Sequence, residues 1–164
     1  MKKITFILFA LVAGTAFAQE SDSAIANATA DIVSPISINK EVDLTFGKVA
    51  NNTAGTVVVA TDNSVGTSSL SQIGTTSPTA ASFSVTAAKD YAYTITLPTA
   101  AVTLTNVSDN NETMTVDTFK HDAGGTPKGT GAVQTVNVGA TLNVGSSQAT
   151  GTYRGQFTVS VDYE

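Results

Sequence analysis

The chain has 164 residues, of which 13 are acidic and 8 basic, giving a formal net charge of −5. An acidic surface repels nucleic acid and anionic lipid, so we expect neither as a partner. The absence of cysteine excludes disulfides, thiolate metal sites and a thiol nucleophile.

Residues 1–18 have the pattern of a secretory signal peptide: Lys2 and Lys3, the apolar run ITFILFALVA, and small residues ending at Ala18. This run is shorter than the roughly 20 residues that cross a bilayer, and no later run approaches that length. We therefore expect an exported protein with no transmembrane segment after cleavage, located at the cell surface, in the periplasm or outside the cell. Cleavage removes two lysines and no acid, so the remaining 146 residues carry a net charge of −7 and are enough for one domain.

Apolar and polar residues alternate with a period of two along most of the remaining chain, which predicts β-strands. No stretch after residue 18 has apolar residues at helical spacing. The stretches between the alternating runs are rich in Gly, Asn, Asp and Ser, which indicates turns. The predicted strands are residues 42–46, 56–61, 83–87, 91–97, 102–104, 114–116, 136–144 and 153–163.

Short strands separated by turns, without crossover helices, predict an all-β fold for residues 32–164: an antiparallel immunoglobulin-like β-sandwich. A closed β-barrel is the alternative. Gly139 is expected to interrupt the strand 136–144 by a bulge or turn. Tyr91, Tyr93 and Tyr153 are in phase with aliphatic residues, which favours the core over a sugar-binding surface. The predicted core is Val57, Val59, Phe83, Val85, Tyr93, Ile95, Leu97, Leu142, Val144, Phe157, Val159 and Val161.

The sequence offers little for catalysis. Its only histidine, His121, lies beside Asp122 in a glycine-rich stretch, and adjacent loop residues rarely orient each other as a catalytic triad requires. The acidic turn at 108–113 lacks the glycine and the distal glutamate of a helical calcium loop. We expect a solvated loop histidine and a non-enzymatic protein with no catalytic residue, metal or cofactor.

The most regular alternation is the final run, residues 153–164. A strand at the edge of a sheet exposes unpaired backbone groups on which another chain can add. Arg154, Asp162 and Glu164 all lie on its polar face, so no charge interrupts the apolar face. We therefore expect this edge to be used for pairing with another chain.

This ending is similar to the C-terminal signature of subunits assembled by the chaperone–usher pathway. The matching features are Gly151 at the fourteenth position from the terminus, the alternating Phe157, Val159 and Val161, and the penultimate Tyr163. In that family the last strand pairs first with a periplasmic chaperone and then flanks a groove filled by the N-terminal extension of the next subunit. The resemblance implies an assembly interface at Gly151, Tyr153, Phe157, Val159, Val161 and Tyr163, with a chaperone, related subunits or further copies as partners.

A broader resemblance covers residues 28–49, 80–98, 114–119 and 139–163. These segments resemble a bacterial secreted family catalogued as domain of unknown function 4402, which is thought to be related to spore-coat-U-like and archaic pilin domains. The two resemblances agree on fold and on export. The family name itself implies no activity.

By this analogy the N-terminal extension, residues 19–31, and the residues just after it contain the donor strand. Its candidate apolar face is Ala24, Ala26, Ala28, Ala30 and Ile32. Two features depart from the pilin pattern: alanine buries little apolar surface, and the disulfide is missing. The alternative is that residues 28–38 form the first strand of a complete sandwich.

Two functions remain open. One is a secreted surface or fimbria-like structural subunit that assembles through its terminal strands. The other is a self-contained binding module, for glycan or protein, that uses loops such as residues 121–131.

Overall fold

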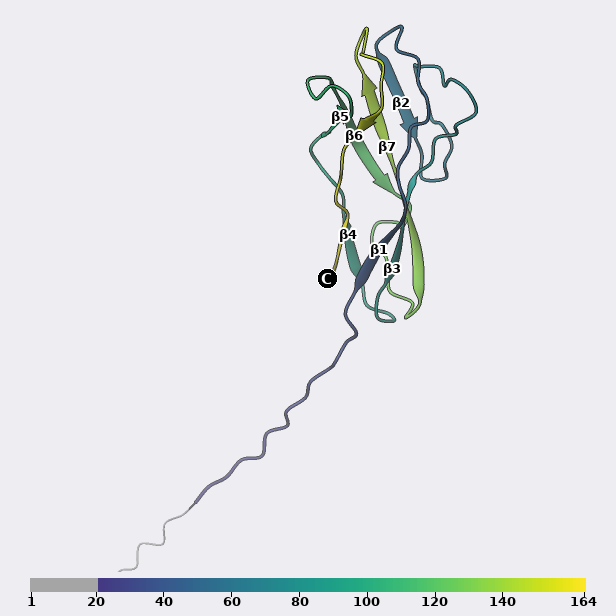
Figure 1. Cartoon of the computed structure of the whole chain (residues 1–164). Helices are drawn as coiled ribbons and strands as arrows, with labels where there is room; N and C mark the ends of the chain where they lie inside the picture. The colour runs from purple at the N-terminus through teal and green to yellow at the C-terminus, as the bar shows by residue number, and fades with distance from the viewer. Residues whose placement is uncertain (1–20) are drawn as a thin grey trace, which may run out of the picture. The chain divides into compact units, whose positions relative to one another are not determined.

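A computed structural model describes residues 21–164 of the chain (Figure 1). The predicted signal peptide lies outside these residues. The chain divides into two units, Met1–Ile32 and Val33–Glu164. Residues 21–32 have no regular secondary structure and every one of them is exposed. Within residues 21–164 we find no helix long and apolar enough to cross a membrane.

The unit Val33–Glu164 contains nine strands, and residues 21–164 contain no helix. The strands are β1 (Ser37–Val42), β2 (Gly55–Val59), β3 (Ala81–Thr86), β4 (Tyr93–Thr96), β5 (Val102–Asn106), β6 (Thr113–His121), β7 (Val133–Val144), β8 (Tyr153–Arg154) and β9 (Ser160–Tyr163). All pairings between them are antiparallel. A strongly curled sheet has the order β1-β3-β7-β6-β5-β8, with β2 also paired to β7, and β4 and β9 form a second sheet (Figure 1). The predicted antiparallel β-sandwich is confirmed.

The 12-residue strand β7 organises the larger sheet. One of its edges pairs with β3 along residues 133–138 and with β2 along residues 140–144, and the other edge pairs with β6. Gly139 lies where the partner changes, and a Cβ there would collide with the backbone carbonyl of Val59. The predicted interruption at Gly139 is wrong: β7 continues through it, and the irregularity lies in β6, between Asp117 and Lys120.

Most of the predicted core is buried. Val57, Val59, Phe83, Val85, Tyr93, Leu142, Val144 and Val161 are buried, whereas Ile95, Leu97, Phe157 and Val159 are only half-buried. Burial raises the pKa of the Tyr93 hydroxyl. The prediction for Tyr91 is wrong: it precedes β4 and is 45% exposed.

Two predicted strands differ from the structure at the ends of the domain. The first strand begins at Ser37 and ends at Val42, so neither residues 28–36 nor residues 43–46 belong to it. The final run is not one paired strand, because only β8 and β9 are paired and residues 155–159 between them are not. The side chains still alternate through the gap, with residues 157 and 159 half-buried and their neighbours exposed.

The close approach at Gly139 gives a stability prediction. Gly139→Ala should destabilise the domain by about 1–3 kcal/mol, because the added methyl group meets backbone atoms that cannot move aside easily. Gly125→Ala is the matched control: nothing lies near its Cβ position, so it should change stability by less than about 0.5 kcal/mol. Urea unfolding measures both, and equal stability of the two variants would contradict the prediction.

Candidate functional site

The segment Gly155–Val159 crosses between the two sheets. β8 pairs with β5 in the larger sheet, and β9 pairs with β4 in the smaller one. None of the backbone N–H and C=O groups of residues 155–159 is hydrogen-bonded to another described residue. Nearly all buried backbone groups in folded proteins are paired, and an extended unpaired segment is a template for a further strand.

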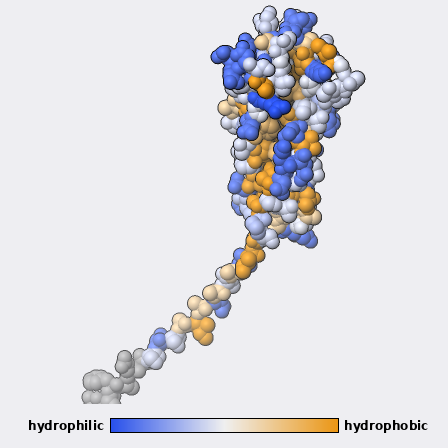
Figure 2. Space-filling view, in the orientation of Figure 1, coloured by the Kyte–Doolittle hydropathy of each residue, from blue (hydrophilic) through white to orange (hydrophobic). Residues whose placement is uncertain are grey.

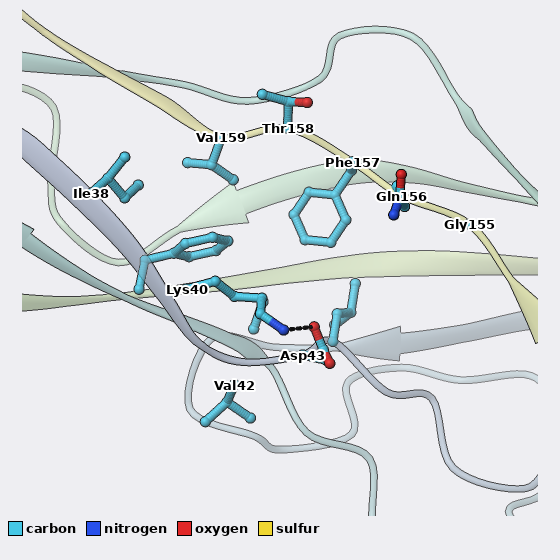
Figure 3. Close-up of a pocket in the computed structure, with 12 residues that line it drawn as sticks. Ile38, Lys40, Val42, Asp43, Gly155, Gln156, Phe157, Thr158 and Val159 are labelled. Atoms are coloured by element: carbon cyan, nitrogen blue, oxygen red, sulfur yellow. Dashed lines mark hydrogen bonds and ion pairs between the residues drawn. The ribbon is translucent and has the colours of Figure 1, made fainter.

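A groove of about 500 Å³ separates this segment from β1 (Figure 3). Its floor is part of the core: the Phe157 ring lies 6.5 Å from Phe83 and 5.0 Å from Phe119, centroid to centroid. In Figure 3, Phe157 and Val159 point from the C-terminal segment into the groove. The lining residues are Ile38, Lys40, Val42, Asp43, Leu44, Ala81, Phe83, Gly155, Gln156, Phe157, Thr158 and Val159. Apolar side chains also reach the surface among polar ones on the face of this unit seen in Figure 2.

Strand β1 forms the opposite wall and is an edge strand. It pairs with β3 alone, so its other edge has no partner strand, and its residues Ile38, Lys40 and Val42 line the groove. Ile38 and Lys40 are paired with the core residues Val85 and Phe83, and directly opposed residues share a face of the sheet. A register shift between Lys40 and Val42 then ends this alternation. The groove therefore lies between β1, which has one unpaired edge, and the unpaired segment Gly155–Val159.

A second hollow of about 510 Å³ lies beside the same segment. It is lined by residues 96–102 together with Gln156, Phe157, Thr158 and Ser160. The connection between β4 and β5 therefore borders the segment without pairing to it.

Close contacts fix the start of the C-terminal segment. Gly151 has a φ of 152°, and a Cβ there would collide with the amide of Asn106. Asn106 is 2% exposed, and its side-chain oxygen accepts hydrogen bonds from the N–H groups of Ser108 and Asp109. The hydroxyl of Tyr153 donates to the carbonyl of Ala149 at 2.8 Å and accepts from Gln148 at 2.9 Å. These contacts explain why glycine and tyrosine stand at positions 151 and 153.

Tyr163 fixes the other end. Its hydroxyl donates to the carbonyl of Ser34 at 2.9 Å and accepts from the N–H of Ala88 at 2.7 Å. The strand β9 is thereby tied to the residues that precede β1. The neighbouring Val161 is 9% exposed and packs with Val85 and Tyr93.

The structure sorts the residues predicted for assembly into three groups. Phe157 and Val159 line the groove, whereas Gly151, Tyr153, Val161 and Tyr163 anchor the segment on either side and do not line it. The predicted donor face lies in the other unit and is fully exposed: Ala24, Ala26, Ala28, Ala30 and Ile32. The sequence pattern missed the β1 wall, because Lys40 at a core-facing position breaks the apolar alternation.

The alternative binding loop, residues 121–131, has no exposed apolar side chain. Its exposed residues are Asp122, Gly124, Gly125, Thr126, Lys128, Thr130 and Gly131. His121 is not a solvated loop residue as predicted: it ends β6, is half-buried, and its Nδ1 has no hydrogen-bond partner among the described residues. Within residues 21–164, no three His, Cys, Asp or Glu side chains gather where they could hold a metal ion.

The geometry defines a class, an antiparallel β-sandwich with an open groove between its first strand and its C-terminal segment. A family model described as "Domain of unknown function (DUF4402)" matches residues 36–163, and the chain belongs to that family. No curated protein and no solved structure matches the chain.

The Tyr163 contacts give a second stability prediction. Tyr163→Phe should destabilise the domain by about 1–2 kcal/mol, because it removes two hydrogen bonds made by one hydroxyl. Tyr91→Phe is the matched control, since that exposed ring packs edge-on against Tyr163 at 5.9 Å and keeps this contact without its hydroxyl. Urea unfolding should separate the two variants, and an unchanged Tyr163→Phe domain would show that the hydroxyl does not hold β9 in place.

Proposed function

We propose that this protein is an exported, non-enzymatic structural subunit of a surface or fimbria-like assembly, and that its groove receives a β-strand from another subunit. The observation that carries the proposal is the groove between β1, which has one unpaired edge, and the unpaired segment Gly155–Val159, with the core as its floor. The signal-like residues 1–18 support export.

A strand is the ligand best suited to such a groove. An extended chain of five residues is about 17 Å long and presents backbone N–H and C=O groups along both of its edges. Placed in the groove, it would pair with β1 on one side and with residues 155–159 on the other. Its inward side chains would cover Phe157 and Val159, which are now only half-buried, and burial of apolar surface contributes about 25 cal/mol per Å².

The segment 21–32 of another copy is the donor that we propose. Alanine alternates at positions 24, 26, 28 and 30 and is followed by Ile32, which gives one small apolar face at strand spacing. The segment has no regular structure, and Ile32 of this face is 98% exposed. Strand exchange would order it and bury its apolar face. In the cell, a periplasmic chaperone would occupy the groove before assembly.

A denaturing gel tests the proposal directly. Surface material from the native bacterium, probed for this protein, should give a ladder without boiling and one monomer band after boiling, because the strands are held without covalent bonds. A single monomer band in both lanes would contradict the proposal and favour a self-contained binding module.

A substitution in the donor segment tests its role. Ala28→Pro should abolish the ladder, because proline in a central strand removes a backbone donor and is not tolerated there. Ala28→Ser keeps the backbone N–H and should retain the ladder. Neither should change the melting temperature of the monomer, since Ala28 is exposed and outside regular structure. A full ladder from Ala28→Pro would exclude this segment as the donor.

A further inference from the structure

Lys40 occupies an unusual place for a charged residue. It stands opposite the core residue Phe83 in the β1–β3 pairing and next to Ile38 on the core-facing side of β1. Its side chain is nevertheless 55% exposed, because it lines the open groove and nothing covers it. Inward-pointing charges on edge strands are a known obstacle to the addition of arbitrary strands.

The ammonium of Lys40 has a local partner, Asp43, at 2.7 Å (Figure 3). Lys40 and Asp43 are the only charged residues among those that line the groove within residues 21–164. Their side chains are 55% and 73% exposed, and ion pairs with that exposure contribute little net stability. Lys40 can therefore exchange Asp43 for another carboxylate with little loss.

The proposed donor segment has the opposite charge. Residues 19–33 contain Glu20, Asp22 and Asp31 but no lysine or arginine. By alternation, Asp22 lies on the same face as Ala24, and Asp31 lies on the opposite face. Each face of the segment thus carries one carboxylate. The long side chain of Lys40 starts on the core-facing side of β1 and extends to the rim of the groove, where it can meet a carboxylate from either face.

We propose that Lys40 determines which strand the groove accepts: it selects the acidic N-terminal segment of a second copy, and its ammonium pairs with Asp22 or Asp31 of that segment. This inference rests on the proposed function and adds the basis of its selectivity. A strand that fills the groove displaces water from around Lys40, and a charge that loses water needs a partner of opposite sign. An acidic donor adds a carboxylate to the exposed one that Asp43 supplies, whereas a basic strand brings a like charge to the lysine and is rejected.

Charge reversal in the full chain tests this inference. Four forms are compared on unboiled gels: the native chain, Lys40→Glu, the donor variant Asp22→Lys/Asp31→Lys, and the combination of all three changes. Two of these forms are single-sided variants, changed either in the groove (Lys40→Glu) or in the donor (Asp22→Lys/Asp31→Lys). In each of them the assembled fraction should fall at least about tenfold, because like charges then meet across the interface. The combined variant should recover most of it. Lys120→Glu, an exposed lysine on β6 that does not line the groove, is the matched control and should assemble normally.

Mixing the two single-sided variants under different tags determines whether the strand comes from another chain. Each carries the groove that fits the other's donor, so co-assembly that neither shows alone supports donation by a second copy. Recovery in the combined variant without co-assembly would mean that each chain fills its own groove, which overturns the second-copy donor. A native ladder that charge reversal leaves unchanged would overturn the role of Lys40 alone. The absence of a ladder from the native chain would overturn the proposed function, and this inference with it. Melting temperatures confirm that each variant is folded.

Discussion

The need of each peptide group for a hydrogen-bond partner governs this fold. Strand β7 meets it on both edges, with β3 and β2 along one side and β6 along the other, and the larger sheet is built outward from that strand. At the other extreme, residues 155–159 have no backbone partner in the described chain, although Phe157 and Val159 pack against the cluster of Ala81, Phe83 and Val138. The side chains of this segment therefore pack on the core of the sandwich, whereas its backbone pairs with no strand. The groove lies between this unpaired backbone and β1.

The segment does not close the gap by itself because both of its flanks are held. On one side, Asn106 packs against Gly151 and β8 pairs with β5, while Gly155 approaches β5 so closely that a Cβ would meet Leu104. On the other side, β9 pairs with β4, and the Tyr163 hydroxyl bridges Ser34 and Ala88. The span between these anchors is kept extended, so a strand that enters finds one wall already arranged. Prior arrangement of this kind lowers the entropic cost of binding.

The alternation of apolar and polar residues was enough to predict the sandwich and most of the buried core. It predicted Phe157 and Val159 as core residues, whereas the structure finds them half-buried and lining the groove. It could not predict the pairing of the last strand, because alternation records which side chains are buried and carries no information on whether a neighbouring strand is present. It also missed the β1 wall. Ile38 is the one residue of β1 that is half-buried, and the other five are exposed. Lys40 stands at a core-facing position, so the strand lacks the apolar alternation by which the others were predicted. Tyr91 shows the opposite error: its phase matches that of Tyr93, but it lies before the start of β4 and is exposed.

In the proposed assembly, the small side chains of the donor would lie against a groove whose floor is already filled by aromatic rings. Large apolar donor residues need deep pockets, yet here the rings of Phe83 and Phe157 already form the floor, and the aliphatic stem of Lys40 takes space on the β1 wall. Alanine brings little apolar area to such a site, so most of the affinity has to come from backbone pairing with two strands at once, as in other strand additions. Backbone pairing is insensitive to sequence, and a face of alanine side chains does little to distinguish one donor strand from another. In the proposed assembly, charge would therefore be the remaining source of selectivity, and Lys40, at a core-facing position of the open edge strand β1, would supply it.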